Sequence, residues 1–293
     1  MRRPRLGLAA VLPGLWLALF FAFPFLLVAK LSVSHTALAM PPYAPQFDLT
    51  AGWPGVLETA RGFSAATYRR LIEDPLYLKA FVSSLALAGA ATAILLIVGY
   101  PIAYGVTRFG PGARRALILA IALPFWTSSL IRIYAWIAIL KPAGLLNKAL
   151  GAVGLPALDI LNTNAAVLLG LVYAYLPFMV LPLYAVLDRQ DATLVEAAQD
   201  LGASPRQVFW RVTFPLSLPG IAAGALLCFI PMVGEFVIPD LLGGPGTLML
   251  GRTIWTEFFA NRDWPAASAV ALVMLAALLV PILLAQRRAR VAP

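Results

Sequence analysis

Three charged residues, Arg132, Glu235 and Asp240, stand in otherwise apolar stretches of this chain of 293 residues. Charged groups inside an apolar layer are costly, so their presence points to a path for a solute or an ion. A carboxylate attracts a cation, and the ring faces of Trp136 and Tyr173 would add cation–π attraction. These five residues are our candidates for contact with a substrate, and the two carboxylates favour a positively charged one.

The residue types that most catalytic sites need are scarce. The chain has one cysteine, Cys228, and one histidine, His35, which lie in separate segments. A disulfide within the chain, a Cys/His zinc site and a Cys–His nucleophile are therefore not predicted. A phosphate-binding loop ends in Gly-Lys-Ser/Thr, and no lysine of this chain follows a glycine. We expect no catalytic residue, no metal and no cofactor bound by this chain.

The sharpest local pattern lies in the polar segment 193–215, which reads as two short helices. Thr193 and Glu196 have the spacing of a capping box at the start of the first helix. Gly202 suits the left-handed position that ends this helix. Glu196 has two open interpretations, as a helix cap or as a contact with a partner protein.

The second helix of this segment has its own start signal. Ser204 and Gln207 form another capping box, and Pro205 occupies the first helical position. Pro215 then returns the chain to the next apolar stretch. The pattern also suits a plain helical hairpin or a DNA-binding helix-turn-helix, but about 25 residues between two apolar stretches leave little room for a DNA-reading domain.

Composition predicts the environment of these elements. The chain is 61% hydrophobic and 12% charged, and its mean hydropathy is +0.86. This apolar surface is too large for one water-soluble core, so lipid is the expected solvent. The net charge of +9 lies in short clusters between apolar runs, which favours a membrane surface over nucleic acid as the partner.

We predict an all-α, polytopic membrane protein with about six transmembrane helices in a single domain, residues 1–293. A membrane helix needs about 20 apolar residues with few charges. The candidate spans are residues 6–31, 80–107, 116–140, 160–187, 215–239 and 264–286, with a polar connection at 188–214. Arg2, Arg3 and Arg5 before the first span imitate a secretory signal, but its apolar core exceeds the roughly 7–15 residues of such signals, which favours an uncleaved span.

The lysines and arginines predict the orientation of the spans, because cytoplasmic loops carry an excess of them. Both termini are expected in the cytoplasm, and the connection from Ser32 to Lys79 outside, with a short helix near residues 65–74. The cytoplasmic pieces then hold twelve of the 22 basic residues: Arg2, Arg3, Arg5, Arg108, Arg114, Arg115, Arg189, Arg206, Arg211, Arg287, Arg288 and Arg290.

The fifth span is the best candidate for lining a pathway, because Pro231, Gly234 and Pro239 interrupt it. Broken helices in membranes are tolerated beside protein or a water-filled path. Alternatives remain open, since proline and glycine are common in membrane helices. Arg132 could equally extend to the outer interface or form a buried pair with Glu235. The aromatic candidates Trp136 and Tyr173 could belong to an interfacial belt, as could Trp126, Tyr175 and Trp255.

The segment 193–215 closely resembles a loop that defines a family of transporters. Glu196-Ala197-Ala198, Gly202 and the ending Val212-x-Phe214-Pro215 match the EAA loop of bacterial ABC-importer permeases, with mild departures at Val212 and Phe214. Residues 124–136 and 234–244 resemble the spermidine/putrescine branch of that family, as do Ser83-Ser84-Leu85 and Asp263-Trp264-Pro265.

The resemblance implies a type I ABC-importer permease fold in the bacterial inner membrane. It also implies that Glu196, Ala197, Ala198, Gly202 and Pro215 belong to a coupling loop that docks on an ATPase dimer, where ATP is hydrolysed. A second permease and an extracytoplasmic solute-binding protein are the other implied partners, and a polyamine is the implied solute. Two rivals remain: a permease for another solute such as an inorganic anion, and a secondary transporter driven by an ion gradient.

Overall fold

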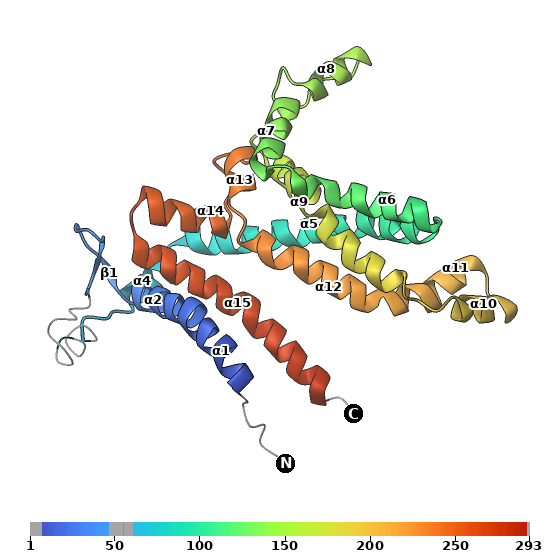
Figure 1. Cartoon of the computed structure of the whole chain (residues 1–293). Helices are drawn as coiled ribbons and strands as arrows, with labels where there is room; N and C mark the ends of the chain where they lie inside the picture. The colour runs from blue at the N-terminus through green and yellow to red at the C-terminus, as the bar shows by residue number, and fades with distance from the viewer. Residues whose placement is uncertain (1–7, 47–54, 56–60, 292–293) are drawn as a thin grey trace. The chain divides into compact units, whose positions relative to one another are not determined.

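The computed structural model describes residues 8–46, 55 and 61–291 of the chain, and side chains for 11–46, 55 and 61–280 (Figure 1). The regular secondary structure of this part is helical apart from two strands of two residues each, which confirms the all-α prediction. The contacts divide the chain into two compact units. Unit 1 comprises residues 1–81 and 253–293, and unit 2 comprises residues 82–252.

Unit 1 is built on the pairing of its first helices with its last. In Figure 1, α2 runs alongside α15, and the two helices are in contact. The short helix α4 and strand β1 also contact α15. The elements are α1 (Leu8–Leu17), the π-helical turn η1 (Ala18–Ala22), α2 (Phe23–Ser32), β1 (His35–Thr36), β2 (Tyr43–Ala44), α4 (Ala66–Glu73), the start of α5 (Pro75–Thr107), the end of α14 (Leu250–Trp255), η4 (Thr256–Ala260) and α15 (Trp264–Val291).

The described parts of the connection after α2 contain a β-hairpin and a helix. Strands β1 and β2 pair in antiparallel fashion, with His35 opposite Ala44. Lys30, buried near the end of α2, donates to the carbonyl of Pro45 at 2.6 Å, and its ammonium group lies 4.3 Å from the Tyr43 ring centroid. The short helix expected near residues 65–74 is present as α4.

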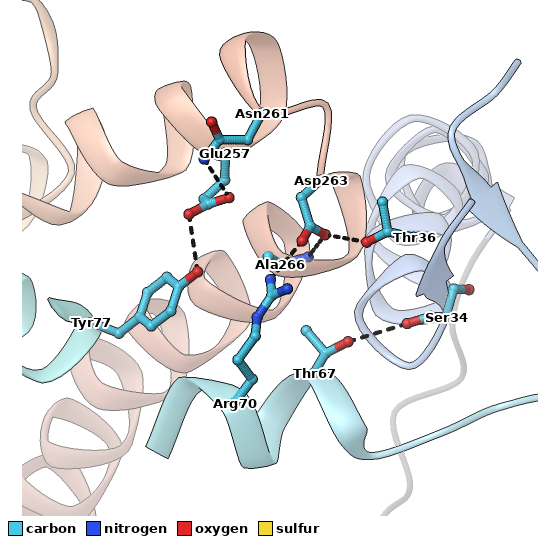
Figure 2. Close-up of polar contacts among 9 residues, drawn as sticks. All are labelled: Ser34, Thr36, Thr67, Arg70, Tyr77, Glu257, Asn261, Asp263 and Ala266. Carbon is cyan, nitrogen blue, oxygen red and sulfur yellow. Dashed lines mark hydrogen bonds and ion pairs between the residues drawn. The ribbon is translucent and has the colours of Figure 1, made fainter. Parts of the chain in front are cut away.

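Asp263 joins three parts of unit 1 (Figure 2). It directly precedes α15, and its Oδ1 accepts from the Ala266 backbone N–H at 3.0 Å, as an N-cap does. The same oxygen accepts from the Thr36 hydroxyl at 2.8 Å, and Oδ2 pairs with Arg70 on α4 at 2.6 Å. Burial alone would raise the pKa of the Asp263 carboxyl, but these hydrogen bonds outweigh it and hold that pKa below its usual value.

A second cluster of hydrogen bonds, around Glu257, lies beside that of Asp263 in Figure 2. The Tyr77 hydroxyl donates to Glu257 at 3.0 Å, and the Asn261 amide donates to the other Glu257 oxygen at 3.0 Å. Thr67 donates to the Ser34 carbonyl at 3.2 Å. Hydrogen bonds thus fasten α4 and the start of α5 to neighbouring parts of unit 1.

Replacement of Asp263 by alanine is expected to destabilise unit 1 by about 2 kcal/mol, because a helix cap and a charged hydrogen bond are both lost. Asp263→Asn keeps a cap oxygen and should cost about half as much. The depressed pKa means that the carboxylate stabilises the fold fully above its unfolded value of about 3.9 and loses this effect as the pH falls through the folded value. Thermal unfolding of the wild type and the two variants in detergent, between about pH 3 and 7, tests these expectations. Equal unfolding midpoints for Asp263→Ala and Asp263→Asn would contradict them.

Unit 2 is centred on α9 and α12, which pack along each other (Figure 1). Helix α13 contacts α7 and α9. The elements are the rest of α5, α6 (Pro111–Ala122), the 3₁₀ turn η2 (Leu123–Trp126), α7 (Ser129–Leu140), α8 (Leu145–Ala152), α9 (Asn164–Leu187), α10 (Ala192–Asp200), α11 (Pro205–Val208), the π-helical turn η3 (Phe209–Thr213), α12 (Phe214–Val233), α13 (Val237–Leu242) and the start of α14.

Glycines on α12 allow it to approach α9 closely. A Cβ atom added at Gly224 would lie 2.9 Å from the Met179 sulfur, and one at Gly220 would lie 3.0 Å from Val186 Cβ. Small residues at helix crossings are typical of membrane proteins, in which dispersion contacts replace the hydrophobic effect between helices. Helices α9 and α12 are therefore closely packed at Met179 and Val186.

Five helices in the described part are long and apolar enough to cross a membrane: Val11–Ser32, Pro75–Thr107, Ser129–Ala152, Asn164–Leu187 and Pro205–Val233. A shorter apolar helix is Trp264–Val280. Each of the six spans expected from the sequence overlaps one of these helices. Residues 6 and 7 of the first expected span lie outside the described residues, as do Arg2, Arg3 and Arg5.

The third expected span, 116–140, is wrong as one continuous helix. Helix α6 ends at Ala122, a 3₁₀ turn follows, and α7 starts at Ser129. Pro124 has no N–H for the helical ladder, and the Thr127 hydroxyl bonds to the Pro124 carbonyl at 2.9 Å. Short hydroxyl side chains offer the backbone such alternatives to a helix, so the Thr-Ser-Ser run favours the break.

Candidate functional site

A pocket of about 690 Å³ lies within unit 2. Its walls come from α7, α9 and α12, with the break between α12 and α13 at one side. Four of the five residues proposed from the sequence line it: Arg132, Trp136, Tyr173 and Glu235. Helices α7 and α9 and the break after α12 therefore bring together residues that lie far apart in the chain.

Glu235 lies in the break that ends α12 at Val233. Its Oε1 accepts from the backbone N–H groups of Phe236 at 3.1 Å and Val237 at 3.0 Å, and its Oε2 accepts from the Tyr175 hydroxyl at 2.9 Å. The start of a helix leaves N–H groups without intrahelical partners, and a carboxylate satisfies them. The expected interruption of the fifth span is thus present, and it fixes the Glu235 side chain at the pocket wall.

Arg132 lines the same pocket from α7. Its guanidinium carbon lies 5.9 Å from the Tyr173 ring centroid, at the outer limit of a cation–π contact. Its Nε and Nη1 have no hydrogen-bond partner among the described residues. The ion pairs of the described part join other residues, so the buried Arg132–Glu235 pair that the sequence left open is not formed there.

Aromatic rings make up much of the remaining wall. The Trp136 and Tyr173 rings meet edge to face at 5.5 Å between centroids, and Phe125 meets Phe178 in the same manner at 4.9 Å. The sequence did not single out Phe125 or Phe178. Phe178 lies five positions after Tyr173 on α9, so helical spacing does not place it beside that residue, and Phe125 reaches the pocket only because η2 turns the chain.

Asp240 lies outside the lining residues of this pocket. It is on α13, where its Oδ1 pairs with the Arg252 Nε at 3.2 Å. Arg252 also donates to the Gly244 carbonyl at 3.0 Å, so the pair fastens α14 to the chain that follows α13. Asp240 therefore stands in a structural ion pair, whereas Glu235 faces the pocket.

The pocket combines one preorganised carboxylate with several aromatic side chains and the positively charged Arg132. A carboxylate between ring faces suits an ammonium ion carried on an apolar chain, because the rings contact methylene groups and also attract the charge. Trp126, another aromatic candidate from the sequence, is exposed and outside the lining, and Trp255 belongs to unit 1.

The α10–α11 hairpin, residues 191–208, begins differently from the prediction. Asp191 is the N-cap of α10, and its carboxylate accepts from the Thr193 N–H at 3.0 Å, so the expected capping box of Thr193 and Glu196 is wrong. Asp191 lies two residues earlier and supplies a charged acceptor, which lets the helix start at Ala192. This hydrogen bond lowers the pKa of the Asp191 carboxyl.

Gly202 ends α10 as predicted. Its φ is +82°, the left-handed region that favours glycine. The Ala203 N–H bonds to the Ala198 carbonyl at 3.0 Å, and the Gly202 N–H bonds to the Gln199 carbonyl at 2.8 Å. These two bonds form a Schellman motif, which turns the chain sharply into α11.

The second half of the hairpin starts as predicted and then differs. The Ser204–Gln207 capping box is present, with Pro205 in the first turn. The helix does not stop before Pro215, however, but runs through η3 into α12, a continuous stretch of Pro205–Val233. Proline lacks an N–H and crowds the carbonyl four residues earlier, and the wider π turn just before it accommodates this.

A second, polar pocket of about 450 Å³ lies beside the hairpin. Glu196 is exposed and lines it, together with the Arg114–Asp188 ion pair. Ala197 is exposed and Ala198 half-buried on the same helix. Since Asp191 caps the helix, Glu196 has no capping role, and its carboxylate lines this pocket. Its contact with a partner protein stays a prediction.

Residues 96–292 match the family model described as binding-protein-dependent transport system inner membrane component. The chain is 46% identical over 211 residues to the spermidine/putrescine transport system permease protein PotB of Haemophilus influenzae, an alignment that covers 71% of this chain and 74% of that protein. It is 42% identical over 215 residues to the PotB protein of Escherichia coli K12, with 72% and 78% covered.

Solved structures share the fold. A crystal structure of a bacterial ABC transporter involved in the import of the acidic polysaccharide alginate matches with a TM-score of 0.70 at 20% sequence identity. The match covers 96% of this chain and 94% of that chain.

Proposed function

The chain belongs to the family of binding-protein-dependent transport system inner membrane components, and on this basis we propose that it is the transmembrane permease subunit of an ATP-driven polyamine importer. Relatives that are 42% and 46% identical carry the name of spermidine/putrescine permeases. The observation that carries the proposal is Glu235, a carboxylate held at the wall of an aromatic pocket by the Tyr175 hydroxyl and two backbone N–H groups.

The substrate class follows from the chemistry of that pocket. Putrescine and spermidine carry ammonium groups separated by methylene chains. The Glu235 carboxylate would bind one ammonium group, and the rings of Trp136 and Tyr173 would contact the methylene carbons and the neighbouring charge. The pocket of about 690 Å³ is within the usual size range of small-molecule sites.

The α10–α11 hairpin is the proposed docking element for an ATPase dimer, with Glu196, Ala197, Ala198, Gly202 and Pro215 as its coupling residues. The exposed Glu196 and the small side chains beside it leave room for close approach of a partner. ATP would be hydrolysed by that partner, and this chain would bind no cofactor. Both units would then act as one permease domain, 1–293, beside a second permease and an extracytoplasmic solute-binding protein.

The proposed location is the bacterial inner membrane, with both termini in the cytoplasm. The clusters of basic residues support this orientation, because arginines at 108, 114 and 115 and at 189, 206 and 211 then fall on the same side. The hairpin lies on that side as well, within reach of a cytoplasmic ATPase.

A permease for an anionic solute is the second candidate, and Arg132 favours it. The residue lines the pocket, and its Nε and Nη1 atoms, which are buried, have no hydrogen-bond partner among the described residues. The positive charge of the guanidinium group would attract a carboxylate or phosphate in the pocket. Competition for uptake between labelled putrescine and unlabelled anions separates the two candidates.

A tagged copy, expressed in its native host and solubilised gently, is expected to bring down a P-loop ATPase, a second permease and a binding protein. Mass spectrometry identifies the proteins, and uptake of labelled putrescine and spermidine in the same strain, with and without this chain, tests the solute. If an intact, active chain recovers no ATPase, the proposal is contradicted and a gradient-driven transporter is favoured. If the ATPase is recovered but polyamines are not taken up, the importer assignment stands and the polyamine assignment fails.

A further inference from the structure

Phe209, the residue directly after the α10–α11 hairpin, contacts helix α5. It is the first residue of the π turn η3, and it is half-buried. Its ring meets the ring of Tyr100 at 5.7 Å between centroids and the ring of Tyr104 at 5.9 Å, both nearly edge to face. Tyr100 and Tyr104 are one helical turn apart on the same face of α5, so Phe209 contacts two successive turns of that helix.

Tyr100 fastens the same cluster to α12. It is buried, and its hydroxyl lies 3.0 Å from the Ser217 hydroxyl. Its ring also lies 5.9 Å from that of Phe214, the first residue of α12. Edge-to-face and tilted rings fix the distance and the angle between the elements that carry them more closely than aliphatic side chains do.

The hairpin is rigid enough to pass a displacement to Phe209. Helix α10 contacts both α11 and η3, and Val208 beside Phe209 is buried. The Gln190 amide donates to the Thr213 carbonyl at 3.0 Å, which joins the end of η3 to the chain before α10. Because η3 continues directly into α12, a displacement of α10 reaches α12 through the backbone. The same displacement reaches α5 through side-chain contacts.

We infer that Phe209, held between Tyr100 and Tyr104, is the positioning residue that passes movement of the α10–α11 hairpin to α5. This inference rests on the proposed function, in which an ATPase displaces the hairpin. Two packed elements move together when the contact between them is stiff and well packed. Loss of the Phe209 ring should therefore separate ATP hydrolysis from transport without removing the surface on which the ATPase docks.

The test uses the complete importer, purified with its ATPase and reconstituted into liposomes with its binding protein. The measured quantity is labelled putrescine transported per phosphate released. Phe209→Leu is expected to lower this ratio about tenfold, since two aromatic pairs with α5 are lost, while the amount of ATPase that co-purifies stays unchanged. Phe209→Tyr keeps a ring in place and should restore most of the ratio.

Two further variants keep the inference falsifiable. Phe109→Leu makes the same chemical change at an exposed phenylalanine of unit 2 and should leave the ratio as in the wild type. Tyr104→Leu removes one of the two pairs from the α5 side and should lower the ratio by about threefold. The inference fails if Phe209→Leu keeps the wild-type ratio, if Phe109→Leu lowers it equally, or if the loss matches a loss of bound ATPase. Absence of any ATPase from the wild type would instead overturn the proposed function, and this inference with it.

Discussion

Glu235→Gln is expected to weaken polyamine uptake by about tenfold or more at low substrate concentration, with no change in the abundance of the protein. A hydrogen bond to a charged group contributes about 1.5–3 kcal/mol, and about 1.4 kcal/mol corresponds to a factor of ten in affinity. Glutamine has the shape of glutamate and keeps an oxygen that can accept from the N–H groups of Phe236 and Val237. The new amide NH2 would donate to the Tyr175 hydroxyl, which donates to Glu235 in the wild type, so the local fold is retained while the negative charge is lost.

The matched control is Asp240→Asn. Asp240 is five residues away, but it pairs with Arg252 and does not line the pocket. It is expected to change uptake by less than about twofold, because an ion pair of this exposure contributes little. Initial rates of labelled putrescine uptake over a range of concentrations measure both variants. Equal losses in the two variants, or no loss in Glu235→Gln, would remove Glu235 from the substrate path.

Gly202→Val is expected to reduce transport by about tenfold or more through loss of the hairpin turn. The φ of +82° is strained for a β-branched residue, at a cost of about 1–3 kcal/mol. A Cβ atom at this position would meet no heavy atom within 4 Å, so the effect is conformational rather than steric. The sharp turn from α10 to α11 should open and displace the exposed face of α10 that carries Glu196.

Gly202→Asn separates this explanation from a simple need for a small residue. Asparagine tolerates the left-handed region better than other residues with a side chain, so it should keep most of the activity although it is larger than alanine. Co-purification of the ATPase and uptake are measured together for Val, Asn and wild type. If Asn is as harmful as Val, close approach of a partner to residue 202, and not the backbone conformation, is the reason for the glycine.

Four of the five pocket candidates could be chosen from the sequence because charge and aromatic rings are conspicuous in apolar stretches. Arg132, Trp136, Tyr173 and Glu235 all line the pocket, but residue type could not separate Glu235 from Asp240. That distinction depends on Arg252, which reaches Asp240 only after α13 and α14 are placed. The contacts of a residue with distant parts of the chain cannot be predicted from the spacing of its neighbours in the sequence.

In the α10–α11 hairpin, too, some backbone features could be predicted from the sequence and others could not. Gly202 and the Ser204–Gln207 box were predictable because each depends on neighbours within a few residues. The N-cap prediction is wrong because Asp191 and Thr193 are both suitable caps, and only the folded chain shows which one the helix uses. Pro215 predicts a helix boundary, but the π turn before it lets the helix continue.

The amino-acid sequence alone is enough to predict the class of the protein. Apolar runs of about 20 residues require helices in lipid, because each backbone polar group there must be bonded within its own segment. It also determined the local turn at Gly202, since its reason is the backbone of one residue. The folded molecule was needed to show which side chains share the pocket, that Tyr175 and two N–H groups hold Glu235, and that Phe209 contacts two turns of α5. Those relations join helices distant in the chain, and they depend on how glycines and ring faces let the helices approach.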